Sequence, residues 1–143
     1  MGRRRTPWIW AALTVQLSGL VFDYVWHGFL HPDFEAVTVR QMVSHLRTVH
    51  LPLYVGVLSV LCTTAWAVIA QARWSRIGIA LPVALVGACV STVGEAWHAY
   101  THLHLSTHSG PLAEATAFLG CIVVVTALWQ ARLGDRQGIT LQR

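Results

Sequence analysis

Apolar residues gather in four long stretches of the sequence, at about 8–30, 51–70, 77–103 and 111–131. Each stretch is close to the roughly 20 residues that an α-helix needs to cross a ~30 Å hydrocarbon layer. Short segments rich in turn-forming residues separate them, such as His31-Pro32-Asp33 and Ser109-Gly110-Pro111. The pattern predicts an all-α integral membrane protein, a four-helix up-down bundle that forms a single membrane domain over residues 1–143.

The segment 31–50 is the one long connection between predicted spans. Its apolar residues Val39, Val43 and Leu46 recur at helical spacing. We expect an amphipathic helix here that lies on the membrane or runs into the second span. The alternative is a solvated loop.

Composition supports a membrane class. The chain is 55% hydrophobic and 11% charged, whereas soluble domains carry about a quarter of their residues as charged ones. Its formal charge is +4, with ten basic residues, all arginine, against six acidic ones. No single basic surface is expected, so nucleic acid is not predicted as a partner. Cys62, Cys89 and Cys121 lie within apolar stretches without CxxC spacing, and we expect them to be packing residues.

The arginines indicate how the spans are oriented, because arginine-rich short loops stay on the cytoplasmic side of a membrane. Eight of the ten fall at one side of a four-span topology: Arg3, Arg4, Arg5, Arg73, Arg76, Arg132, Arg136 and Arg143. Only Arg40 and Arg47 fall at the other side. We therefore expect a multi-pass protein of the cell membrane with both termini in the cytoplasm.

All eight histidines fall on the side opposite the arginine clusters. Depth follows from the helical rise of 1.5 Å per residue, which places Asp23 about 10 Å inside the outer boundary and Glu95 at a similar level. Asp23 and His27 are four residues apart, and Glu95, His98 and His102 share one helix face. Because an ionisable group that faces lipid is costly, these polar stripes should turn inward.

Such a layer of imidazoles and carboxylates predicts a divalent transition metal. Lone buried anions are unfavourable, and no arginine lies within a span to neutralise them. Imidazole and carboxylate side chains on facing helices can bind one or two ions, and Glu95-x-x-His98 has the form that di-iron bundles use. The predicted ligands are His27, His50, His98, His102, Asp23, Glu95 and Glu114. Tyr54 and Thr101 are candidate supporting groups, while His31, His45, His104 and His108 are expected at the surface or the rim.

The expected function is metal-dependent chemistry on a lipid-soluble small molecule, at a site that faces the extracytoplasmic side. With iron or copper the protein would be an oxidoreductase acting on a molecule such as a quinone or an acyl chain. With zinc it would be a hydrolase, in which Glu95 or Asp23 serves as the catalytic general base.

Three alternatives stay open at this point. One is a b-type cytochrome with haem held between His27 and His98 or His102, and with propionates near Arg40 or Arg47. Another is an accessory subunit of a larger membrane complex, or a homo-oligomer. The third is a proton or metal-ion carrier, which has the least support because the cytoplasmic halves of the spans are almost wholly apolar.

Overall fold

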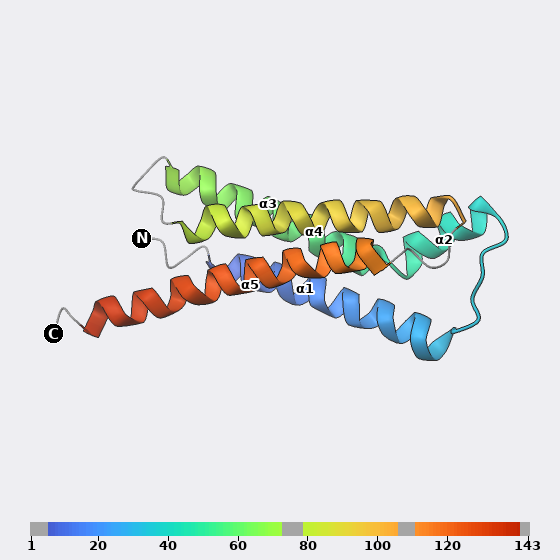
Figure 1. Cartoon of the computed structure of the whole chain (residues 1–143), viewed down its shortest axis with the longest axis horizontal. Coiled ribbons are helices and arrows are strands. Elements are labelled where there is room, and N and C mark those ends of the chain that lie inside the picture. Colours follow the sequence, from blue (N-terminus) through green and yellow to red (C-terminus); the bar gives the residue numbers. More distant parts are fainter. Residues whose placement is uncertain (1–5, 73–78, 106–110, 141–143) are drawn as a thin grey trace.

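The long helices expected from the apolar stretches are present in the computed structural model, which describes residues 6–72, 79–105 and 111–140. The α-helices are α1 (Thr6–Val25), α2 (Val39–Thr48), α3 (Leu51–Ala72), α4 (Ala80–Leu103) and α5 (Pro111–Thr140). A five-residue π-helix, η2 (Trp26–Leu30), continues α1 (Figure 1). No strand occurs in these ranges, so the all-α prediction is confirmed.

Within the described residues, four segments are long and apolar enough to cross a membrane: Pro7–Leu30, Leu51–Ala72, Ala80–Leu103 and Pro111–Leu133. They match the four predicted apolar stretches, with ends that differ by a few residues. This pattern of length and composition is that of a multi-pass membrane protein.

The long helices pack in chain order, α1 against α3, α3 against α4, and α4 against α5. Glycines allow two of these contacts to bring backbones together. A Cβ atom on Gly56 of α3 would lie 2.3 Å from the Cα of Gln16, and one on Gly94 of α4 would lie 2.3 Å from the amide nitrogen of Ala117. Small residues at helix contacts are typical of membrane bundles, where tight packing replaces the hydrophobic effect as the driving force.

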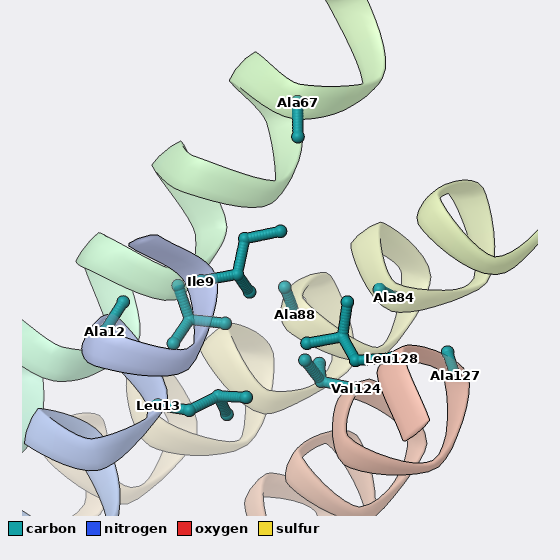
Figure 2. Packing of buried hydrophobic residues seen from close by; sticks show 10 residues of the cluster. Ile9, Ala12, Leu13, Ala67, Ala84, Ala88, Val124, Ala127 and Leu128 are labelled. Atoms are coloured by element: carbon teal, nitrogen blue, oxygen red, sulfur yellow. The ribbon is translucent and has the colours of Figure 1, made fainter. Parts of the chain in front are cut away.

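The largest hydrophobic cluster joins the four long helices in one half of the molecule. Figure 2 shows how its small and branched side chains meet. The buried members are Ile9, Ala12 and Leu13 of α1, Val60 and Ala67 of α3, Ala84 and Ala88 of α4, and Val124, Ala127 and Leu128 of α5. Cys121 is buried as expected, but Cys62 and Cys89 are exposed, so the packing interpretation is wrong for these two.

The amphipathic helix predicted within 31–50 is α2. A capping box begins it. The Thr38 hydroxyl accepts a hydrogen bond from the backbone N–H of Gln41, and the side-chain oxygen of Gln41 accepts one from the backbone N–H of Thr38. Its buried residues are Met42, His45 and Leu46. The predicted apolar face is therefore wrong in part, because Val39 and Val43 point outward.

Candidate metal centre

Five histidines from four different segments converge at one place in the protein. His27 lies in η2, His45 in α2, His50 immediately before α3, and His98 and His102 in α4. His45, His50, His98 and His102 are buried, and His27 is half-buried. We call these five residues the histidine cluster.

The ring nitrogens of the cluster face one another. The Nε2 atom of His45 lies 3.2 Å from Nε2 of His27 and 3.1 Å from Nε2 of His50. A neutral imidazole nitrogen either carries one hydrogen or offers one lone pair. His45 Nε2 therefore cannot form a full hydrogen bond with both neighbours, whereas an ion between the rings would accept the lone pairs of all three.

On α4, His98 and His102 form a second close pair, with their Nε2 atoms 2.9 Å apart. Nitrogens bound side by side to one ion at 2.0–2.1 Å are about 3 Å apart, so the observed spacings are those of metal ligands. The described residues form two groups of three possible ligands, and within each group the three ligand atoms lie within 4.8 Å of one another. The first group is His27, His45 and His50, and the second is His50, His98 and His102. His50 belongs to both groups.

Local structure explains how these rings meet. The π-turn of η2 carries His27, and its hydrogen bond runs from the His31 amide to the Trp26 carbonyl at 2.8 Å. His31 precedes Pro32, which disfavours the α conformation and ends the helix. Only two residues separate α2 from α3, so His45 and His50 are held close together. His98 and His102 are one turn apart on the same face of α4.

Two histidines of the cluster, His45 and His50, lie outside the apolar spans, and both favour the neutral form. Burial, together with the neighbouring imidazoles of His27 and His102, lowers the pKa of His45 to about 4. Burial is also the main cause that holds the pKa of His50 well below its usual range. Metals bind neutral imidazole, so these residues are ready to act as ligands at neutral pH.

Carboxylates surround the cluster. The Oδ1 atom of Asp23 lies 3.2 Å from Nδ1 of His50 and 3.6 Å from Nε2 of His27. The Oε1 atom of Glu114 lies 4.0 Å from Nδ1 of His98. A carboxylate beside Nδ1 keeps the hydrogen on that nitrogen and turns the Nε2 lone pair toward a metal. In the described part of the chain, the groups that could hold an ion contain histidines only, with the carboxylates beside them.

All four histidines predicted as ligands come together, and one residue was missed. His27, His50, His98 and His102 all join the cluster. His45 was expected at the rim and instead lies in the interior, which corrects that prediction. The i, i+3, i+4 spacing of Met42, His45 and Leu46 is the signal that could have identified it.

The other candidates have simpler positions. His31 and His104 are exposed, as expected, and His108 lies outside the described residues. Tyr54 stacks on His50, with ring centroids 5.8 Å apart. Thr101 donates its hydroxyl hydrogen to the backbone carbonyl of His98, so its contact is with the helix and not with the ring.

Beside the cluster is a cavity of about 800 Å³. His27, His98 and His102 line it, together with the acidic residues Asp23, Glu95 and Glu114. The rest of its lining is mostly apolar and comes from α1, α5 and neighbouring segments: Leu20, Val21, Tyr24, Pro32, Phe34, Leu53, Pro111, Ala115 and Phe118.

The fold and the cluster together define a helical protein with four segments able to span a membrane and with buried histidines that could bind a metal ion. No family model, no curated protein and no solved structure matches this chain. Its function must therefore be inferred from the residues of the site.

Proposed function

We propose that this protein is an integral membrane metalloprotein whose histidine cluster holds a transition-metal ion and presents it to a lipid-soluble molecule. The observation that carries the proposal is the meeting of three Nε2 atoms at His45, within 3.2 Å, in the interior of an apolar protein. Buried polar atoms need partners, and one hydrogen cannot serve three converging nitrogens.

The donor set favours zinc, copper or iron, because imidazole suits these ions. Asp23, Glu95 and Glu114 complete the proposed site, either as additional ligands or by orienting the imidazoles. A redox-active ion would make the protein an oxidoreductase. A zinc ion would make it a hydrolase, with Glu95 or Asp23 accepting a proton from a bound water.

Two features support a lipid-soluble substrate. The cavity beside His27, His98 and His102 has the size of a small-molecule site. Part of its apolar wall is exposed on the outside of spanning segments, with Val21 62% and Phe118 52% accessible. A molecule dissolved in the bilayer could therefore reach the imidazoles from the side.

The arginine distribution supports a topology for the proposed protein. A single up-down membrane domain with both termini in the cytoplasm would leave most arginines at the cytoplasmic surface. The histidine cluster would then lie in the extracytoplasmic half of the bundle. In this arrangement the ion would be supplied from outside the cytoplasm.

The close ring contacts favour a non-haem ion over haem b. Axial ligands on opposite faces of a haem iron are about 4 Å apart at bond lengths of 2.0–2.1 Å, with the macrocycle between them. Here the candidate axial pair His27 and His102 has ring centroids 6.2 Å apart, but the ring of His50 lies 5.6 Å from that of His27 and 5.1 Å from that of His102, so a third imidazole lies beside both. Such spacing suits ligands on the same side of an ion.

Elemental analysis of protein purified in detergent without chelators tests the proposal. We expect at least one equivalent of zinc, copper or iron in the wild type and a loss of most of it in His50→Ala, since His50 belongs to both ligand groups. His104→Ala is the matched control, because the exposed His104 side chain bonds the Tyr100 carbonyl and packs on the Tyr100 ring, outside the histidine cluster.

Two results would contradict the proposal. One is a wild-type protein that binds none of these metals even after equilibration with each of them, which would favour the accessory-subunit alternative. The other is a His50→Ala variant that keeps its full metal content. An optical spectrum of the same sample separates a non-haem ion from haem b, which would give an intense Soret band.

A further inference from the structure

The cavity beside the histidine cluster lies where α1 and α5 separate. The two helices are linked near their middles, where the Gln16 amide of α1 donates to Cys121 Sγ of α5 at 2.9 Å. Toward the end of α1 and the start of α5 they diverge (Figure 1). The space between them is lined by Val21 and Tyr24 on one side and by Ala115 and Phe118 on the other.

Glu95 lies at the inner wall of this cavity. Its side chain is 7% exposed and lines the cavity. No hydrogen bond or ion pair involves Glu95 within residues 6–72, 79–105 and 111–133. An acceptor buried in this way calls for a donor supplied from outside the protein.

The polar lining also selects by charge. Asp23, Glu95 and Glu114 all face the cavity, and no arginine is among its described lining residues. Without a bound ion, a lipid with a carboxylate or phosphate head would meet three acidic groups and no arginine among these residues. A neutral head that donates a hydrogen bond would find acceptors in the carboxylates.

We propose that the cavity binds a neutral, long-chain lipid whose head is a hydroxyl or phenol group, with the hydroxyl donating to Glu95 and the chain lying between α1 and α5. The apolar residues of both helices form the surface for the chain. The hydroxyl oxygen then faces the side of the cavity lined by His98 and His102. This inference rests on the proposed function only in making this lipid the substrate, since binding itself requires no ion.

Binding of 4-nonylphenol and of its methyl ether, 4-nonylanisole, to the purified protein tests the proposal. The ether has the same chain and ring but no hydrogen to donate. We expect the phenol to bind about tenfold more tightly, which is the effect of one net hydrogen bond. In Glu95→Leu this preference should disappear, whereas Glu35→Leu, which alters an exposed acid outside the cavity, should keep it.

A second variant tests the cavity itself. Ala115 lines the cavity and is exposed, so Ala115→Trp should fill space without disturbing the packed interfaces. We expect weaker binding of both probes to this variant. Equal binding of phenol and ether by the wild type would overturn the proposal. So would a preference that survives in Glu95→Leu, tighter binding of laurate than of the phenol, or unchanged binding by Ala115→Trp.

Metal content measured on the same samples separates this proposal from the metalloprotein proposal. His45 is not part of the cavity lining, so His45→Ala should lose metal and still prefer the phenol. Phenol preference without any bound metal in the wild type would retain the cavity proposal and overturn the metal site. Bound metal without phenol preference would retain the metal site and overturn the cavity proposal.

Discussion

The Nε2 atoms of His45 and His50 lie 3.1 Å apart although the two residues belong to different helices. His45 is in the last turn of α2, and His50 immediately precedes α3. The connection is short, and the His45 carbonyl accepts a hydrogen bond from the Val49 amide at 2.8 Å. An ion bound to both rings would therefore fasten α2 to the bundle, and metal binding should stabilise this helix.

Removing the metal should loosen α2 specifically. An ion that binds only the folded arrangement stabilises it by mass action, by about 2.7 kcal/mol at a free concentration 100 times its dissociation constant. We expect chelation to speed amide hydrogen exchange in α2 (Val39–Thr48) by tenfold or more, with little change around Ala84 and Ala88 in the hydrophobic cluster. Equal protection of α2 with and without metal would show that the ion does not bind His45.

Asp23 should strengthen metal binding through His50. Replacing it by asparagine keeps its size but removes the negative charge 3.2 Å from His50 Nδ1. Loss of such a partner typically lowers metal affinity 10–100-fold. Competition with a chromophoric chelator measures the change, and Asp33→Asn is the control because Asp33 is exposed. Unchanged affinity in Asp23→Asn would mean that Asp23 plays no part in the site.

Gly94 should be intolerant of even one methyl group. A Cβ atom there would lie 2.3 Å from the Ala117 amide nitrogen and 2.7 Å from its Cα, and both atoms belong to the backbone of α5. We expect Gly94→Ala to force α4 and α5 apart at a cost of about 1–3 kcal/mol. Thermal unfolding in detergent should show the loss, while Gly28→Ala, which meets no atom within 4 Å, should unfold near the wild-type temperature.

The buried contact of Gln16 with Ser91 and Cys121 should stabilise the middle of the bundle. The Gln16 amide donates to Ser91 Oγ at 2.8 Å and to Cys121 Sγ at 2.9 Å. Interhelical hydrogen bonds in membranes contribute about 0.6–2 kcal/mol. We therefore predict a loss in that range for Gln16→Leu, measured as a free energy of unfolding. Thr14→Val is the control, since the Thr14 hydroxyl bonds only its own helix, at the Trp10 carbonyl.

A double-mutant cycle tests the same contact. Cys121→Ala removes the sulfur acceptor, so its effect should shrink when Gln16 is already leucine. Additive effects of the two substitutions would contradict a direct interaction. Cys121→Ser supplies a different acceptor and should retain much of the stability.

Much of the fold could be predicted because membrane spans are set by length and hydropathy. The polar residues of the spans also indicate which faces turn inward, since lipid excludes them. From the sequence alone, this reasoning places His27, His50, His98 and His102 at one level of the bundle. It works best for His98 and His102, which lie on the long regular helix α4, while His27 in η2 and His50 immediately before α3 lie at the ends of such helices.

The remainder of the site depends on short segments that periodicity cannot define. His45 lies on a helix of ten residues whose buried face was misassigned, because Val39 and Val43 are as apolar as the residues that pack inward. The π-turn at Trp26–Leu30 rotates the chain around His27 in a way that a regular 3.6-residue period does not describe. The cavity depends on the divergence of α1 from α5, a tertiary property that no local pattern records.

The coordination of the bound ion tests the central claim most directly. X-ray absorption at the edge of the metal found by elemental analysis reports the type, number and distance of its ligands. We predict at least three imidazole nitrogens at about 2.0–2.1 Å, with a reduced number in His45→Ala. A spectrum with only oxygen or sulfur ligands, or one that is identical in wild type and His45→Ala, would contradict the account.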